Sequence, residues 1–354
     1  MLIIIAATCR ASSFILRSNV SCARARAISS SNGFSRAHGS GNTWYEPSLM
    51  DHMLFRIQEC NRVPGNIELL DFSVDGKILG KVTPKVAKRL CSISTESSEP
   101  VFELRDSLTL SKAAGSTPES RTAAVGSVME ALRDSDYITG WRNEMYPVAQ
   151  SFDEVSSPVF LVERAAASLL GVLEYGVHVN GLVKEENGNM KMWMARRSKT
   201  KSKFPGLLDH IVAGGQPAGL SLMDNVVKEC SEEAGIPLEL TLKGVKPSGA
   251  ISYANYGGKL KNEGEGVMSR VVLFCFDLEL PNDFVPNAND GEVESFFKWN
   301  LKQIAKSMDP ACNDPIKPNC YLVIIDWLMR TGAISPDSPK YLEVLRTLRS
   351  GTCN

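Results

Sequence analysis

The sequence predicts an α/β protein with a smaller α+β region near its N-terminus. From about residue 160 onward, apolar strand-like stretches alternate with helical patterns, as in α/β folds. Before that point, a hairpin pattern and a helical pattern form a separate group within residues 50–150. The chain has 354 residues, a length that favours about two domains of ~100–200 residues each.

Residues 50–150 carry the signals of a small folded domain. The segment "ELLDFSVDGKILGKVTP" alternates apolar and polar residues around Asp75-Gly76, which predicts a β-hairpin. The segment "RTAAVGSVMEALRDSD" has apolar residues at helical spacing. Residues 110–120 are polar and are expected to form a loop. We assign residues 50–150 to an N-terminal accessory domain.

Residues 155–335 are predicted to form the main domain, and residues 336–354 a C-terminal tail or helix. Periodicity and length separate the expected helices from the expected strands. Helices are expected at 162–176, 222–234 and 319–332, and strands at "GVHVNGLV", "MKMWMARR", "GLLDHIVAGG", "RVVLFCFDLEL" and "VESFFKWN".

Composition limits the classes of partner. The net charge is −1, which gives no electrostatic reason to expect a nucleic acid polymer or an anionic membrane as partner. No apolar run reaches the ~18 residues of a membrane-spanning helix. The nine cysteines are irregularly spaced and form no CxxC pair, which argues against a disulfide framework or a zinc site and favours free thiols.

Residues 1–45 differ from the rest of the chain. They contain several arginines and many serines but no acidic residue, a composition typical of an organelle transit peptide. A secretory signal is less favoured, because the apolar run near the start is short and no basic residue precedes it. We expect import into the chloroplast, with the mitochondrion as the alternative.

Both ends of the helix expected at 222–234 have recognisable signals. Ser221 is a suitable N-cap, and Asp224, three residues later, can complete a capping box. Gly235 suits the left-handed position that follows a helix. These boundaries place three glutamates in the last helical turn.

Glu229, Glu232 and Glu233 repel one another and the negative end of the helix dipole. Like charges three or four residues apart cost about 0.2–0.5 kcal/mol per pair, and an acid at this end costs roughly 0.3–1 kcal/mol. At ~100° per residue, the three acids form one stripe at the edge of the apolar face. Mg²⁺ (or Mn²⁺) would turn this repulsion into shared attraction, since hard cations prefer oxygen ligands. The alternative is a solvated acidic edge.

The surrounding segment resembles the Nudix box, a glycine, five residues, Glu, seven residues and then R-E-U-x-E-E-x-G-U, where U is aliphatic. Two positions depart from the pattern, since Leu220 replaces the first Glu and Lys228 replaces the Arg. In the family those two residues brace the loop–helix–loop through an ion pair, which apolar packing at Leu220 can replace here. The matching residues are Gly214, Glu229, Cys230, Glu232, Glu233, Gly235 and Ile236.

The resemblance extends over most of the chain beyond residue 45. The segments "GWRNEMYPV", "EYGVHVNG", "DGEVESFFKW" and "KPNCYLVIIDWLMRTG" are similar to plant chloroplastic Nudix hydrolases and their fungal relatives. These carry an N-terminal domain shared with thiamine-pyrophosphokinase fusion proteins. The resemblance implies a Nudix α/β/α sandwich with an N-terminal α+β accessory domain. It also implies hydrolysis of a diphosphate in a nucleoside diphosphate derivative or in a damaged or oxidised thiamine diphosphate.

Within this resemblance, Glu229, Glu232 and Glu233 are the expected ligands of Mg²⁺ or Mn²⁺. The catalytic candidates are Glu229, Glu233 and Glu292. Glu229 is the preferred general base, and Glu292, in the acidic stretch "NANDGEVESF", is the second choice. The alternative for Glu292 is a solvent-facing strand position.

The substrate-binding candidates are two arginines, two glycines and one tryptophan. Arg196 and Arg197 open a basic run that suits phosphate oxygens, although a solvated loop is an alternative. Gly214 and Gly215 belong to the glycine loop. Trp141 can stack on a substrate ring, while core packing is its more common role.

Two further expectations concern residues and function outside this set. His178 and His210 lie in apolar strands and are expected to be core histidines with satisfied hydrogen bonds. The alternative to hydrolysis is a Nudix fold that binds a ligand with little or no turnover. The expected partner is a small-molecule diphosphate, and no specific protein partner follows from the sequence.

Overall fold

The computed structural model describes residues 44–94, 99–201, 203–257, 266–289 and 291–351. The predicted transit peptide therefore lies almost entirely outside the described residues. Within these ranges no helix is both long and apolar enough to span a membrane.

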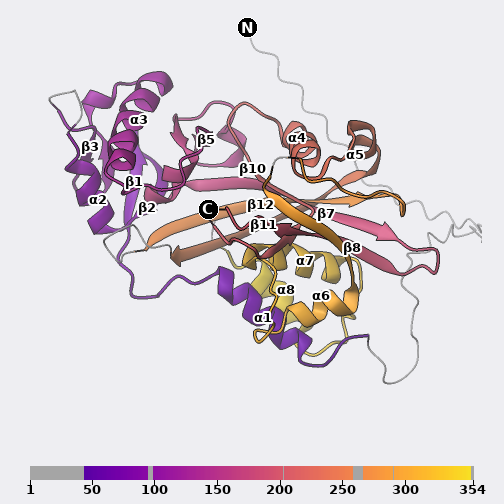
Figure 1. The fold of residues 1–354 in the computed structure, drawn as a ribbon. Helices are drawn as coiled ribbons and strands as arrows, with labels where there is room; N and C mark the ends of the chain where they lie inside the picture. The colour runs from indigo at the N-terminus through magenta and orange to yellow at the C-terminus, as the bar shows by residue number, and fades with distance from the viewer. Residues whose placement is uncertain (1–43, 95–98, 202, 258–265, 290, 352–354) are drawn as a thin grey trace, which may run out of the picture. The chain divides into compact units, whose positions relative to one another are not determined.

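The larger part of the structure is built on one mixed β-sheet (Figure 1). Its main path runs in the order β11-β12-β7-β8-β13, and β10 and β9 extend it by pairing with β7 and β8, respectively. Strands β7 and β12 are parallel, whereas the other pairs are antiparallel. The strands are β7 (Leu173–Lys184), β8 (Met190–Arg197), β9 (Leu208–His210), β10 (Val212–Gly215), β11 (Val245–Gly257), β12 (Val267–Glu279) and β13 (Val293–Asn300).

Helices cover both faces of this sheet, which gives the expected α/β/α sandwich. Alternate residues of β7 and β12 point to opposite faces, so each strand contributes to two apolar cores. Helices α4 and α5 close one core, and α1, α6, α7 and α8 close the other. The helices are α1 (Leu49–Cys60), α4 (Leu222–Ala234), α5 (Leu238–Gly244), α6 (Leu301–Ser307), α7 (Pro318–Arg330) and α8 (Tyr341–Leu348).

A second group of elements forms the N-terminal α+β part. Its four-stranded sheet has the order β2-β1-β4-β3, and a two-stranded sheet of β5 and β6 packs into the same core. The bounds are β1 (Leu70–Val74), β2 (Lys77–Val82), α2 (Pro84–Cys91), β3 (Phe102–Leu104), β4 (Leu108–Leu110), α3 (Pro118–Asp134), β5 (Met145–Val148) and β6 (Phe160–Glu163). The predicted hairpin is confirmed, with Asp75 and Gly76 at φ 51° and 78° in its two-residue turn.

Strand β2 approaches the segment that leads into β7 closely at two glycines, Gly80 and Gly171. Lys81 N–H donates to the Gly171 carbonyl at 3.2 Å. A Cβ on Gly171 would lie 1.8 Å from the Lys81 carbonyl oxygen, and one on Gly80 would lie 2.0 Å from the Leu170 carbonyl oxygen. Only glycine permits the backbones to approach this closely.

The segment 162–176 differs from its prediction as one helix. Only Arg164–Leu169 is helical, as a short 3-10 turn, and β7 begins at Leu173. The strand is buried on both faces, so its nearly continuous apolar run does not distinguish a strand from a helix by periodicity. Gly171, at φ 56°, separates the two elements.

Helix α1 packs against the larger part of the structure, although the sequence predicts that its residues belong to the accessory domain. This helix lies within the predicted accessory range, yet its apolar face packs in the core formed with α7 and α8. The domain boundaries themselves remain predictions. Helix α8, which follows α7, lies within the region predicted to be a tail or helix.

Candidate active site

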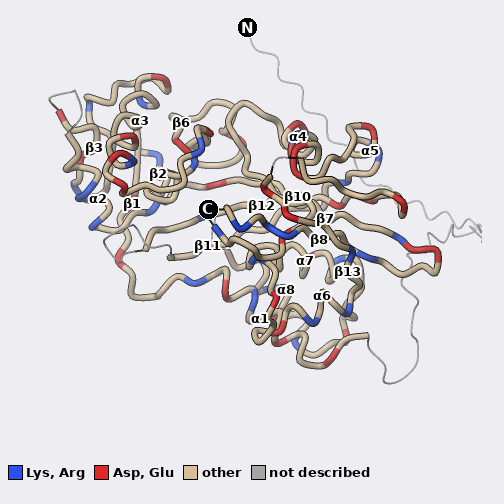
Figure 2. Tube along the Cα trace, viewed as in Figure 1, with Lys and Arg blue, Asp and Glu red and all other residues tan. Residues whose placement is uncertain are grey.

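Helix α4 is fixed at both ends by the residues that predicted it. The Ser221 hydroxyl accepts a hydrogen bond from the Asp224 N–H at 3.1 Å and donates to the Asp224 carboxylate at 2.6 Å. Gly235 is left-handed at φ 61°, and the N–H of Ile236 returns to the Cys230 carbonyl at 2.9 Å. Figure 2 shows the acidic residues concentrated along this helix.

The three glutamates of α4 differ in exposure. Glu229 and Glu233 are 8% and 9% exposed, whereas the Glu232 side chain is 53% exposed. Two of the three glutamates are therefore buried, and the third lies at the surface. Lys228, the residue in place of the family's arginine, pairs with Glu229 at 3.2 Å and with Glu232 at 2.9 Å. Burial raises the pKa of Glu229, and the Lys228 ammonium opposes that rise.

Glu233 is the most perturbed acid of the stripe. Burial raises its pKa to about 8, and the negative charge of Glu229 adds to the rise. Its carboxylate accepts a hydrogen bond from the Ala213 N–H of β10 at 2.8 Å, and this hydrogen bond opposes the rise in pKa. Glu233 thus connects α4 to the backbone of the glycine strand.

The glycine loop lies directly against the glutamates. A Cβ on Gly214 would lie 2.3 Å from the carboxylate carbon of Glu229, so any larger residue would displace that side chain. The loop is braced by amides, since Asn225 Nδ2 donates to the Gly215 carbonyl at 2.7 Å and to Gln216 Oε1 at 3.0 Å. Asn225 and Gln216 are both buried.

Leu220 does not replace the family ion pair by apolar packing. Its side chain is 39% exposed, so that expectation is wrong. Its carbonyl instead accepts a hydrogen bond from Gln216 Nε2 at 2.8 Å. The buried Gln216–Asn225 pair supplies the brace, and amide side chains spaced nine residues apart give no recognisable sequence signal.

Strand β5 of the N-terminal part contacts the same loop. The N–H of Ala218 donates to the Met145 carbonyl at 2.9 Å. Tyr146 is buried, and a Cβ on Gly215 would lie 1.8 Å from its hydroxyl oxygen. The segment "GWRNEMYPV" therefore reaches the glycine loop through Met145 and Tyr146.

Charged residues that were absent from the predicted set surround Tyr146. The Arg164 guanidinium lies 5.7 Å from the Tyr146 ring centroid and donates to Glu144 at 2.7 Å. Glu174, at the start of β7, is half-buried, and burial raises its pKa while Lys203 and Arg164 lower it. These residues are far from the box in sequence and carry no motif.

The predicted basic candidates have protein partners. Arg196 forms a bidentate pair with Asp314, with one contact of 2.7 Å. Arg197 pairs with Asp209 at 2.7 Å. Glu292 forms an ion pair with Lys201, a charge that also lowers the pKa of Glu233. Phosphate contact by the arginines and catalysis by Glu292 stay predictions.

Trp141 lies at the edge of the N-terminal core. Its ring is half-buried, the Arg133 guanidinium is 4.7 Å from the ring centroid, and its Nε1 donates to Asn143 at 2.9 Å. Its contacts are therefore those of a packed residue with one open side. A role in substrate stacking stays a prediction.

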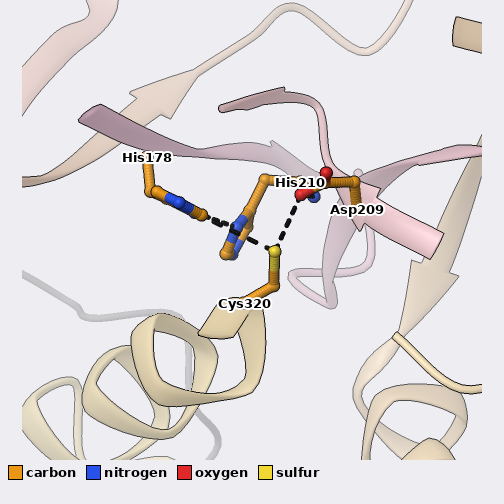
Figure 3. A group of neighbouring side chains, drawn as sticks. All are labelled: His178, Asp209, His210 and Cys320. Carbon is orange, nitrogen blue, oxygen red and sulfur yellow. Dashed lines mark hydrogen bonds between the residues drawn. The ribbon is translucent and has the colours of Figure 1, made fainter. Parts of the chain in front are cut away.

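A different group of side chains meets beneath the sheet, between β7, β9 and α7 (Figure 3). His178 Nδ1 and His210 Nδ1 are 2.9 Å apart, and Cys320 Sγ lies 2.7 Å from Asp209 Oδ1. Burial lowers the pKa of both histidines, that of His210 to about 4, and raises the pKa of Cys320. His210 Nε2 has no hydrogen-bond partner among the described residues, so the expectation of fully satisfied histidines is wrong for this atom.

The comparisons with known proteins agree with the fold and the box. Residues 52–174 match the family model described as "Domain of unknown function (DUF4743)", and residues 174–320 match the model described as "NUDIX domain". The chain is 39% identical over 335 residues to Nudix hydrolase 20, chloroplastic, of Arabidopsis thaliana, which covers 92% of this chain and 85% of the relative.

Two further relatives extend the comparison. Nudix hydrolase 24, chloroplastic, of Arabidopsis thaliana is 39% identical over 310 residues, or 85% of this chain and 78% of the relative. An uncharacterized protein of Saccharomyces cerevisiae is 38% identical over 215 residues, or 59% of this chain and 60% of the relative. The predicted link to the thiamine-pyrophosphokinase-associated domain stays a prediction. The sandwich, the glycine loop against an acidic helix and these matches together show that the chain is an enzyme of the Nudix hydrolase family.

Proposed function

We propose that the protein is a Mg²⁺- or Mn²⁺-dependent hydrolase of a small-molecule diphosphate. The observation that carries the proposal is the burial of two carboxylates of one helix against a glycine loop. Glu229 and Glu233 are almost fully buried, yet Lys228 contacts only Glu229 of the two. A buried pair of acids is costly unless a cation or protons compensate it.

The donor set fits a hard divalent cation. Glu229, Glu232 and Glu233 offer only carboxylate oxygens, the ligands that Mg²⁺ and Mn²⁺ prefer. When bound, such an ion would neutralise diphosphate oxygens and acidify a water molecule. Lys228 pairs with Glu229 and Glu232, while burial raises the pKa of Glu233 and so favours its protonated form unless a cation compensates its charge.

Residues of this chain would accept the proton, orient the acids and bind the phosphate. Glu229 is the preferred general base, because burial raises its pKa towards the range in which a carboxylate accepts a proton. The Ala213 N–H orients Glu233, and Gly214 lets the loop approach the acids. Arg164, 43% exposed in its side chain, presents a cation beside the loop that suits a phosphate.

For the substrate, we infer a nucleoside diphosphate derivative or a thiamine-diphosphate-like molecule, including its damaged or oxidised forms. This choice follows from the resemblance to the chloroplastic branch. The contact of β5 with the glycine loop supports a role for the N-terminal part as one wall of the pocket. Contacts remote from the reacting phosphorus can determine which diphosphate is preferred.

We also place the enzyme in the chloroplast. Both Arabidopsis thaliana relatives are chloroplastic by name, and residues 1–45 have the composition of a transit peptide. A reporter fused to residues 1–50 should enter plastids. A reporter that remains in the cytosol would contradict the transit interpretation.

A panel of diphosphates tests the function directly. We expect the full chain with Mg²⁺ to release monophosphate or phosphate from at least one nucleoside diphosphate derivative or thiamine diphosphate analogue, and EDTA to stop the reaction. Binding without product on every compound would instead favour the ligand-binding alternative. Glu233→Gln is the inactive control for contaminating hydrolases.

The same panel tests the wall formed by the N-terminal part. Trp141→Ala should lower kcat/KM for the preferred substrate about tenfold and leave poor substrates nearly unchanged, because it leaves the acids intact. Melting temperature is measured in parallel. An equal loss on two unlike diphosphates with a lower melting temperature would show that Trp141 only packs against the core.

A further inference from the structure

We propose that His178, Asp209, His210 and Cys320 form a second metal site, separate from the glutamate stripe, that binds a thiophilic divalent cation such as Zn²⁺. One ligand atom from each residue lies within 4.8 Å of the other three, and all four residues are buried. Within the described residues this is the set of metal-ligating side chains whose donor atoms converge. The glutamates of α4 do not converge in this way.

The donor types select the ion. Two imidazole nitrogens, one thiol sulfur and one carboxylate oxygen form a mixed N/S/O set that suits zinc and is unsuitable for Mg²⁺. A tetrahedral zinc ion with bonds of about 2.0–2.3 Å separates its ligand atoms by about 3.3–3.7 Å. The separations are 2.9 Å between the histidine Nδ1 atoms, 2.7 Å from Cys320 Sγ to Asp209 Oδ1 and 3.9 Å from Cys320 Sγ to His178 Nδ1, and the four ligand atoms all lie within 4.8 Å of one another, so they scatter on both sides of that range. Small side-chain shifts would therefore open a four-ligand site.

Asp209 is oriented for this role by its neighbours. Its Oδ2 is held by Arg197 at 2.7 Å and by Lys317 at 3.3 Å. Its Oδ1 faces the cluster, where it accepts from the His210 N–H at 2.9 Å and from the Cys320 thiol. The two oxygens thus have separate functions, since one is fixed by cations and the other is presented to the ligand set.

The two buried histidines are joined by a single Nδ1–Nδ1 hydrogen bond of 2.9 Å, in which only one of the two nitrogens can donate. An ion bound by both Nδ1 atoms would replace that bond. His210 Nε2, which has no partner among the described residues, would not take part. A metal-bound Cys320 thiolate would supply negative charge to the ion, while the Asp209 carboxylate shares its charge with Arg197 and Lys317. Cys320 lies in the first turn of α7, where the helix dipole acts against the rise in the pKa of its thiol that burial causes.

The site would lie on the face of the sheet opposite α4, close in sequence to the glycine loop. His178 is on the face of β7 opposite Val177 and Val179, which pack towards α4. Three residues after His210, the Ala213 N–H binds Glu233. An ion at the cluster would fix β9 to α7 and thereby support the backbone that orients Glu233. We assign it a structural role.

The test uses Co²⁺ as a spectroscopic probe on the purified full chain. After removal of bound metal, one equivalent of Co²⁺ should produce a thiolate-to-metal charge-transfer band in the near-ultraviolet and tetrahedral bands in the visible. Zn²⁺ should displace both. Because the glutamate stripe offers only oxygen ligands, Glu233→Gln should leave these bands intact, which distinguishes the site from the proposed catalytic one.

Cys320→Ser should remove the charge-transfer band, whereas Cys275→Ser should keep it. Cys275 is a matched control, since it is a buried thiol on β12 whose Sγ donates a hydrogen bond to the Leu273 carbonyl and which lies outside the four-residue cluster. The wild-type titration stands even if Cys320→Ser fails to fold. Absence of the band in folded wild type, with no zinc retained through purification, would overturn the proposal and show that the cluster is only a hydrogen-bonded network.

Discussion

Replacing Glu233 with glutamine should reduce diphosphate hydrolysis at least about a hundredfold while making the metal-free protein more stable at alkaline pH. The loss of activity follows from removal of a carboxylate ligand. The gain in stability follows because burial and Glu229 raise the pKa of Glu233 to about 8 in the fold, whereas an unperturbed glutamate titrates near 4.5. The folded chain therefore holds this proton up to higher pH than the unfolded chain does.

The sign of the pH dependence is fixed by this difference. Between about pH 4.5 and 8 the folded state binds more protons at Glu233 than the unfolded state, so its stability falls as pH rises. Glutamine does not titrate and removes that penalty. Melting temperatures in EDTA should be higher for Glu233→Gln than for wild type at pH 8.5, and the difference should shrink towards pH 5.

Glu232→Gln is the matched control, because the Glu232 side chain is half exposed and its charge is paired with Lys228 at 2.9 Å near the surface. It should change the melting temperature in EDTA by less than Glu233→Gln does. Added Mg²⁺ should stabilise wild type more than Glu233→Gln. Full turnover of Glu233→Gln at saturating Mg²⁺, with a lower melting temperature at pH 8.5, would refute the assignment of Glu233.

The largest loss of stability is expected from Gly171→Ala. This residue has φ 56°, where a side chain costs about 1 kcal/mol or more. Its Cβ would also lie 1.8 Å from the Lys81 carbonyl oxygen, a backbone atom that cannot rotate away. With about 1–3 kcal/mol for the forced displacement, we expect a total cost of about 2–4 kcal/mol.

Gly188→Ala separates the two causes. Gly188 has φ 83°, but no atom lies within 4 Å of the added Cβ, so only the conformational cost of about 1 kcal/mol applies. Denaturant unfolding of both variants measures the difference. Equal losses would mean that an added Cβ at residue 171 is accommodated against Lys81 without a steric cost.

The sequence predicts those features that depend on local spacing. Ser221 and Gly235 bracket α4 as expected, and the Asp75-Gly76 turn joins β1 to β2, because caps and tight turns need particular residues at fixed positions. The segment 162–176 was misassigned, because a strand buried on both faces has no alternation to reveal it. The different exposures of Glu229, Glu232 and Glu233 could not be predicted from sequence, because they depend on how α4 packs against the sheet.

Features assembled from distant segments could not be predicted in this way. His178, Asp209 and Cys320 come from three elements, so the rule that zinc ligands occur in short spaced pairs does not find them. The buried Gln216–Asn225 brace and the contact of Tyr146 with Gly215 also depend on tertiary packing. In each case the residue types are ordinary, and only their convergence in space is informative.

The packing of α1 has a consequence for how the protein can be divided. The chain contributes one helix to the outer layer beside α7 and α8, leaves to form the N-terminal α+β part, and then returns as β7. In topological terms that part is an insertion between the first and second elements of the sandwich. A fragment that begins at residue 155 would lack α1 and expose the buried face of α7 to water, because the packed sandwich includes a helix from outside that range.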